Sequence, residues 1–278
     1  MILFLILIEE REDLVGFNII VVAIIGLIFG SFLNMLIYRL PLGISLINPK
    51  RSICTNCNYQ IKWFENIPIL SYIYLRGKCS NCKEKISLVY PIVELITSFI
   101  TIALFLKIGF SYQLLLIISL FYSLIVLSFI DLKFKAVPDY LLIISLLIGI
   151  LFTVTYKQEY IIMFFIFAGG IVLLELFVTF YIQNIKSKIL NDESLKDQKA
   201  LGEGDIPIVA IVGGLLGIKL GIFAIFLSAI LAIIPSLLYK ILKKDIEMPF
   251  IPFLTLALFI IYAYDSYYLE LLKEIIKI

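Results

Sequence analysis

The sequence contains no histidine, only one tryptophan and few charged residues, which make up 16% of the chain. Without histidine there is no Ser-His or Cys-His nucleophile and no histidine-ligated metal site, so acid–base chemistry must come from carboxylates, lysine, tyrosine or cysteine. A charged fraction well below the roughly 25% of an average soluble domain argues against a soluble enzyme and against intrinsic disorder. Four cysteines in 278 residues are too few for a secreted disulfide scaffold.

Apolar residues are abundant instead, at 62% of the chain, with a mean hydropathy of +1.08. Long apolar runs, without the alternation of barrel strands, predict an all-α polytopic membrane protein. Gly169 and Gly170, inside one run, are expected to permit close helix packing. Runs 206–218 and 220–239 adjoin and could form one bent element. The eight candidate transmembrane helices are 17–37, 92–106, 114–130, 140–154, 160–182, 206–218, 220–239 and 250–264.

The distribution of charge predicts the orientation in the membrane. Most of the 23 basic residues fall in the loops that share a side with the polar blocks 38–90 and 183–205. Basic loops face the cytoplasm, so both blocks are expected there. The net charge of +2 is too close to zero to indicate a nucleic-acid partner. Nothing in the sequence indicates an oligomeric state.

All four cysteines lie in the first polar block, as two Cys-x-x-Cys pairs: Cys54 with Cys57, and Cys79 with Cys82. Two such pairs can complete a tetrahedral site of four thiolates, which suits a structural zinc ion. A reducing cytoplasm disfavours two disulfides, and the remaining alternative is four free thiols. Because four protein ligands leave no open position for catalysis, the zinc is expected to stabilise a small domain between the first two helices.

Two aspartates stand at the ends of apolar runs. Asp131 closes the run 114–130, and Asp205 opens the run 206–218 after Gly-Glu-Gly. Both are expected at the cytoplasmic ends of helices, where paired carboxylates can share one proton and hydrolyse a peptide without a nucleophilic side chain. Alternatively, Asp205 only caps a helix and Asp131 only marks a membrane boundary. A transporter could also use the pair as a proton or cation relay.

Together these motifs resemble the bacterial type IV prepilin peptidases, which are GxGD-type aspartic membrane proteases that combine a leader peptidase with an N-methyltransferase. The resemblance runs from about residue 30 to residue 256. A presenilin-like GxGD protease, the alternative within this class, would have deeper aspartates and would lack the cysteine block. The segments that carry the resemblance are 30–41 (GSFLNMLIYRLP), 51–57, 63–72 (WFENIPILSY), 76–82, 90–95 (YPIVEL), 131–139 and 202–205 (GEGD).

The resemblance implies that Asp131 and Asp205 are the catalytic pair of an endopeptidase in the bacterial inner (cytoplasmic) membrane. Its substrates would be prepilins and pseudopilins, cut at the cytoplasmic face after a short basic leader. The new N-terminal residue would then be methylated with S-adenosylmethionine. Three parts are expected: the first helix (1–37), the zinc-binding and methyltransferase block (38–91) and the peptidase domain (92–278).

The resemblance also suggests residues for methylation or substrate binding. Gly77 matches a family glycine linked to methylation, and four polar candidates join it: Asn34, Arg39, Glu65 and Glu94. Asn34 could instead hydrogen-bond between helices, and Arg39 could anchor a helix end. In one place the sequence departs from the family, because residues 249–252 read Pro-Phe-Ile-Pro where Pro-Phe-Gly-Pro is usual.

Overall fold

The computed structural model describes residues 2–48, 51–190, 193, 202–241 and 248–265. Within these residues every regular element is a helix, and β structure is limited to two isolated bridges in the cysteine block. The predicted all-α membrane fold is confirmed. The chain forms two compact units, Met1–Val126 and Leu127–Ile278, whose boundary lies inside helix α4 (Tyr112–Phe134). The three domains expected from the sequence remain a prediction.

Six described helices are long and apolar enough to cross a membrane. The last of them contains the predicted sixth and seventh spans, and the predicted eighth span is the shorter helix α9 (Ile251–Ala263). The six candidate spans are Asn18–Arg39, Val89–Ile108, Tyr112–Phe134, Asp139–Tyr156, Gln158–Ile189 and Asp205–Leu237.

Helix α8 (Asp205–Ile241) is broken at Gly217, which has φ 69° and ψ −172°. A methyl group on Gly213 or on Gly221 would lie 2.6 Å from the ring of Phe167. Eight residues of a straight helix span about 12 Å, too far for one ring to lie so close to both positions. The chain therefore folds back at Gly217, and α8 consists of two half-helices.

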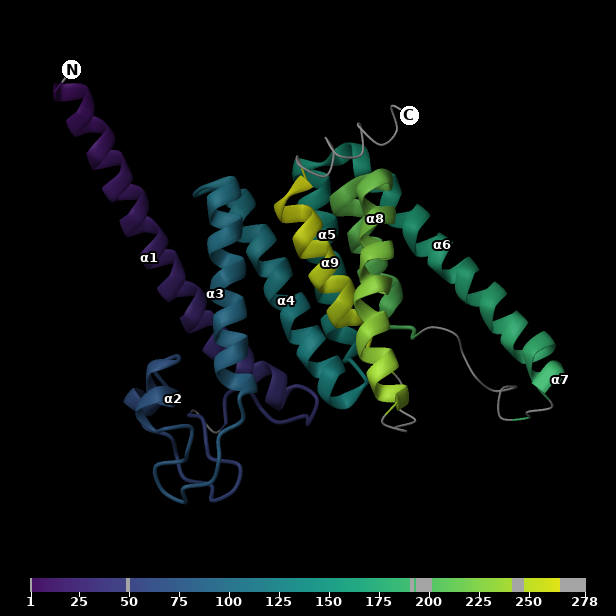
Figure 1. Cartoon of the computed structure of the whole chain (residues 1–278), viewed down its shortest axis with the longest axis horizontal. Helices are drawn as coiled ribbons and strands as arrows, with labels where there is room; N and C mark the ends of the chain where they lie inside the picture. The colour runs from purple at the N-terminus through teal and green to yellow at the C-terminus, as the bar shows by residue number, and fades with distance from the viewer. Residues whose placement is uncertain (1, 49–50, 191–192, 194–201, 242–247, 266–278) are drawn as a thin grey trace. The chain divides into compact units, whose positions relative to one another are not determined.

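The first unit is organised around α1 (Ile2–Arg39) and α3 (Val89–Ile108), which pack against each other. Figure 1 shows the loops between them, with the short helix α2 (Leu70–Tyr74), beyond the adjoining ends of α1 and α3. One turn of 3-10 helix, η1 (Trp63–Asn66), precedes α2. The predicted cysteine block is therefore an excursion between two packed helices.

Small residues bring α1 and α3 into backbone contact. A methyl group on Gly26 would lie 2.6 Å from the Cα of Ser98, and one on Gly30 would lie 2.6 Å from the Cα of Glu94. The Ser98 hydroxyl donates to the carbonyl oxygen of Ala23 at 2.9 Å. Positions rise along α1 as they fall along α3, so the helices are antiparallel, and glycines four residues apart permit the close approach.

In the second unit, α8 contacts α5 (Asp139–Tyr156), α6 (Ile161–Phe180) and α9. Figure 1 shows α9, in yellow, alongside the green α8. Most of α9 is buried. One turn of 3-10 helix, η2 (Gln158–Tyr160), precedes α6. After α6 the chain continues as the π-helix η3 (Tyr181–Lys186) and the short helix α7 (Ser187–Leu190).

The glycine pair of α6 differs from the glycines of α1. Among the described residues, nothing lies within 4 Å of a methyl group on Gly169 or Gly170. The close packing expected at these two positions is therefore not found within the described part of the chain. Of the polar block 183–205 that follows, residues 191–192 and 194–201 lie outside the described residues.

Candidate functional site

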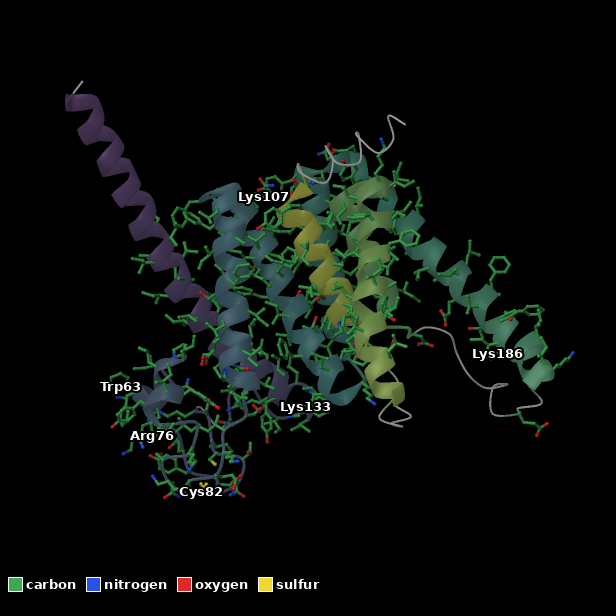
Figure 2. The ribbon with its side chains drawn as sticks, viewed as in Figure 1. Trp63, Arg76, Cys82, Lys107, Lys133 and Lys186 are labelled. Atoms are coloured by element: carbon green, nitrogen blue, oxygen red, sulfur yellow. The ribbon has the colours of Figure 1, made fainter. Side chains whose placement is uncertain are left out.

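The four cysteine sulfurs come together in the loops between α1 and α3. All four Sγ atoms lie within 4.8 Å of one another; the Sγ atoms of Cys54 and Cys82 are 3.8 Å apart, and those of Cys57 and Cys79 are 4.0 Å apart. Four sulfurs at about 2.3 Å from one zinc ion would be about 3.8 Å apart in a tetrahedron. Figure 2 shows the sulfurs, with Cys82 labelled, at the end of α3 opposite to Lys107. The cysteine set therefore fits a tetrahedral metal site.

The two cysteine pairs form equivalent turns. In each turn, the residue after the second cysteine has a positive φ, 55° at Asn58 and 61° at Lys83. Its N–H donates to the carbonyl oxygen of the first cysteine of its own pair, at 2.9 Å and 3.1 Å. Both turns thus present their sulfurs through the same backbone geometry, as expected for two halves of one site.

Two asparagines that sequence reasoning missed link the two turns. The Asn56 Nδ2 lies 3.8 Å from the Cys82 Sγ, and the Asn81 Nδ2 lies 3.7 Å from the Cys57 Sγ. Each asparagine therefore donates to a sulfur of the opposite turn. The signal was present in the sequence, because both pairs read Cys-x-Asn-Cys.

The thiols of this cluster do not hold their protons equally. A backbone hydrogen bond with Tyr59 lowers the pKa of Cys57 to about 6, and one with Cys82 lowers the pKa of Cys79. A backbone hydrogen bond with Glu84 acts on Cys82 in the same direction, but burial and hydrogen bonds to the other thiols raise its pKa to about 11. A divalent cation that binds all four sulfurs must therefore displace protons, so its affinity falls as the pH falls.

Asp131 lies in the last turn of α4 and is only 8% exposed. Its Oδ2 accepts a hydrogen bond from the backbone N–H of Ile251, the first residue of α9, at 3.3 Å. Lys135, with φ 55°, ends the helix and donates its N–H to the carbonyl oxygen of Asp131 at 2.9 Å. The carboxylate is thus buried at a helix end and held by a backbone donor.

Asp205 is the first residue of α8 and is 7% exposed. It lies close enough to Asp131 for the two carboxylates to interact electrostatically. At the preceding residue, a methyl group on Gly204 would lie 3.0 Å from Val137 and 3.7 Å from the Cδ1 of Ile251. The structure therefore brings the two predicted aspartates to one end of the second unit.

The Pro-Phe-Ile-Pro segment falls at this same place. Ile251 stands where the family usually has glycine, and its φ is not positive. Any residue with an N–H can therefore adopt this backbone and donate to Asp131.

Glu203, between the two glycines of the Gly-Glu-Gly-Asp motif, is exposed.

Asn34 and Glu94 both lie at the packed ends of α1 and α3. The Asn34 Nδ2 donates to the carbonyl oxygen of Tyr90 at 3.0 Å. The Glu94 Oε2 accepts from the N–H of Ile69 at 2.8 Å, and the Ser31 side chain also hydrogen-bonds to Glu94. Ile69 has φ 60°, so Glu94 holds an unusual backbone turn directly before α2.

Arg39 binds the loop that follows α1. Its guanidinium donates to the carbonyl oxygens of Ser45 at 2.9 Å, Leu46 at 3.2 Å and Arg51 at 3.2 Å. This side chain is buried and clamps the backbone that leads into the first cysteine turn. The contacts are those of an anchoring residue at a helix end.

Glu65 and Gly77 lie within the cysteine block. Desolvation opposes ionisation of Glu65, but hydrogen bonds with the Lys62 backbone and the side chains of Ser80 and Tyr59 hold its pKa below the ordinary value. Gly77 has φ 65°, and a methyl group there would lie 2.9 Å from the Tyr72 Oη. Glycine is therefore required at this position for the backbone conformation and for space.

Comparison with known proteins gives two family matches. Residues 24–108 match the bacterial peptidase A24 N-terminal domain, and residues 118–237 match the type IV leader peptidase family. These matches, on a bundle of membrane-length helices, define a membrane peptidase.

Relatives extend the match over most of the chain. A prepilin leader peptidase/N-methyltransferase of Neisseria gonorrhoeae is 30% identical over 93% of this chain and 95% of the relative. One of Vibrio cholerae is 31% identical over 78% and 84%, and one of Pseudomonas putida is 28% identical over 87% and 89%. No solved structure matches the chain. The chain belongs to the prepilin leader peptidase/N-methyltransferase family.

Proposed function

We propose that this protein is an aspartic endopeptidase that removes the leader peptides of type IV prepilins and pseudopilins at the cytoplasmic face of the bacterial inner membrane. It then methylates the new N-terminal residue with S-adenosylmethionine. The observation that carries the peptidase proposal is the pair of buried carboxylates, Asp131 and Asp205, at adjoining helix ends. Family membership favours this function over the transporter alternative.

The two carboxylates would hydrolyse the leader as an acid–base pair. Two neighbouring carboxylates share one proton, so one of them is charged and the other is protonated. Asp131 is suited to carry the charge because its Oδ2 accepts the N–H of Ile251. Asp131 takes a proton from water as the water oxygen attacks the peptide carbonyl carbon, and Asp205 donates its proton to the carbonyl oxygen. The C–N bond of the tetrahedral intermediate then breaks as Asp131 passes its proton to the leaving amine and Asp205 recovers its proton from the hydroxyl group.

The position of the pair suits a substrate that is itself a membrane helix. A prepilin carries an apolar helix directly after its leader, and this helix could lie beside the enzyme's spans. The scissile bond would then meet the carboxylates at the membrane rim. Lys133 and Lys135 lie two and four residues after Asp131, as expected for a cytoplasmic helix end.

The cysteine cluster would hold zinc in a structural role, through Cys54, Cys57, Cys79 and Cys82. Zinc would supply cross-links that fold the block. The side chains of Asn34, Arg39 and Glu94, which were candidates for binding the methyl donor or the substrate, form hydrogen bonds to backbone groups of the chain itself. No methyl-transfer step follows from these contacts, and the proposal of methylation rests on the family.

The proposal is tested with the purified protein, a prepilin and isotope-labelled S-adenosylmethionine, with the product masses as the readout. We expect a loss of the leader followed by a gain of one methyl group. Asp131→Asn and Asp205→Asn should each lower the cleavage rate at least about 100-fold, because each removes one acid–base group. Asp139→Asn, an exposed aspartate at the start of α5, is the matched control and should cleave normally. Cleavage at the wild-type rate by either dyad variant would refute the pair.

A further inference from the structure

The N-terminal half of α9 is tied to the last turns of α4 at two successive points. The Ile251 N–H donates to the Oδ2 of Asp131 at 3.3 Å, and the hydroxyl of Ser128 donates to the Oγ1 of Thr255 at 3.1 Å. Ser128 and Thr255 are each 6% exposed. The second bond lies one helical turn from the first on both helices, so it fixes the register in which the first one forms.

The first turn of α9 leaves a single N–H free for Asp131. Pro252 has no N–H, and the next two N–H groups along the helix donate to the carbonyl oxygen of Phe250, at 3.1 Å and 3.2 Å. Only the Ile251 N–H therefore remains at the start of this helix, and it is directed at the carboxylate.

The same residue also contacts the surroundings of the other carboxylate. The Ile251 side chain is 2% exposed, and its Cδ1 would lie 3.7 Å from a methyl group on Gly204, next to Asp205 in the chain. Through its N–H and its side chain, Ile251 thus connects the two segments that carry the aspartates.

We propose that α9 positions the catalytic pair, with Thr255 and Ser128 as positioning residues that act through Ile251. This inference rests on the proposed peptidase function. The bond between Ile251 and Asp131 is already long for an N–H···O contact, so a slide of α9 by a few tenths of an ångström would break it. The hydroxyl pair opposes this slide, because the slide would also break the buried hydrogen bond between Ser128 and Thr255.

Thr255→Val is the direct test, since it keeps the shape of the side chain and removes the oxygen that accepts from Ser128. With a prepilin as substrate, we expect kcat to fall about ten- to a hundredfold at an unchanged KM, because the dyad loses its geometry while the substrate helix still binds. Thr255→Ser keeps the oxygen that accepts from Ser128 and should have a kcat near the wild-type value. Ser128→Ala should reproduce the defect, and the double variant should be no worse than either single one.

Thr153→Val is the matched control. Thr153 is fully buried, and its Oγ1 donates between two helices of the same unit, to the carbonyl oxygen of Gly214 at 3.1 Å. It should lower the thermal stability as much as Thr255→Val does, but leave kcat near the wild-type value. An equal loss of kcat in both variants would show that Thr255 has only a structural role and would overturn the inference.

Wild-type kcat in Thr255→Val would also overturn the inference, and so would wild-type kcat in Ser128→Ala if Thr255→Val does not fold. Asp131→Asn, measured in parallel, separates the two proposals. If Asp131→Asn is inactive while the hydroxyl variants are normal, only the positioning role fails. If Asp131→Asn cleaves normally, the dyad and its positioning by α9 fail together.

Discussion

The cysteine block and the aspartate site are built by opposite means. Among the described residues between α1 and α3, Cys79 alone is buried, whereas the helices around the aspartates contain many fully buried apolar side chains. The block takes its shape from four sulfurs and short backbone turns. The positions of the aspartates are set by packed helices, among which α9 is mostly buried. A segment too small to form an apolar core needs a cross-link, whereas a bundle of long helices does not.

Removal of the metal is expected to have the largest effect and to distinguish the two regions most clearly. A chelator, or Cys79→Ala, should unfold the block, because zinc binding supplies about 10–16 kcal/mol in such sites. Hydrogen exchange followed by mass spectrometry should show loss of protection over residues 51–86 and unchanged protection in α5 and α8. We expect methylation to be lost and cleavage to fall less than in the aspartate variants. Unchanged exchange over 51–86 would show that the four thiols hold no metal that matters to the fold.

A pair of glycine variants sharpens the comparison between packed and open helix faces. Gly30→Ala places a methyl group 2.6 Å from the Cα of Glu94, so α1 and α3 must separate. We expect a loss of about 1–3 kcal/mol in unfolding free energy, as for other overpacked sites. Gly170→Ala, where nothing described lies within 4 Å, is the control and should be neutral or slightly stabilising, because alanine favours a helix more than glycine does. Thermal unfolding in detergent measures both, and equal melting temperatures would contradict the backbone contact.

The asparagines of the cysteine turns test the equivalence of the two turns. Asn56→Ala and Asn81→Ala each remove one donor to a sulfur of the opposite turn. Outer hydrogen bonds of this kind change metal affinity about 10- to 100-fold. We expect similar losses for both variants in a competition titration with a zinc chelator, and no loss for Asn48→Ala, which lies outside the turns. A large effect at only one of the two asparagines would show that the turns are not equivalent.

The smallest expected effect is a pH dependence that comes from Glu65. Folding lowers its pKa, so ionised Glu65 stabilises the block above the ordinary glutamate pKa of about 4.3. This contribution is lost as the pH falls through the folded-state pKa. Glu65→Gln should therefore lower the stability at neutral pH and leave it almost unchanged at low pH. Melting temperatures across the pH range, compared with the exposed control Glu84→Gln, measure the difference, and parallel curves for the two variants would exclude it.

The sequence was sufficient for those features that depend on local pattern. Apolar runs predicted the membrane helices, and the spacing of Cys54, Cys57, Cys79 and Cys82 predicted one cluster. The possible bend between the sixth and seventh runs is present at Gly217. These features follow from residue spacing along the chain and need no knowledge of which helices are neighbours.

Contacts between segments that are distant in the chain could not be predicted from the sequence. The role of Ile251 shows why: its N–H meets a carboxylate 120 positions away, and nothing in the local pattern indicates which helix end will face Asp131. An isoleucine stands here where the family usually has glycine, and the contact uses the backbone N–H, which both residues possess. Likewise, close packing was expected at Gly169 and Gly170 of α6, but it is found at Gly26 and Gly30 of α1, for which no close packing was expected from the sequence.

The length of α9 has one more consequence. Its 13 residues span about 20 Å, whereas the hydrocarbon layer of a bilayer is about 30 Å thick. Either the lipid thins around this helix, or one of its ends lies below the lipid surface, where exposed peptide groups need a polar partner. At the Ile251 end that partner is the Asp131 carboxylate, which takes a proton from water in the proposed mechanism. Under the proposed mechanism, the thickness of the surrounding lipid should therefore affect how readily water reaches the scissile bond.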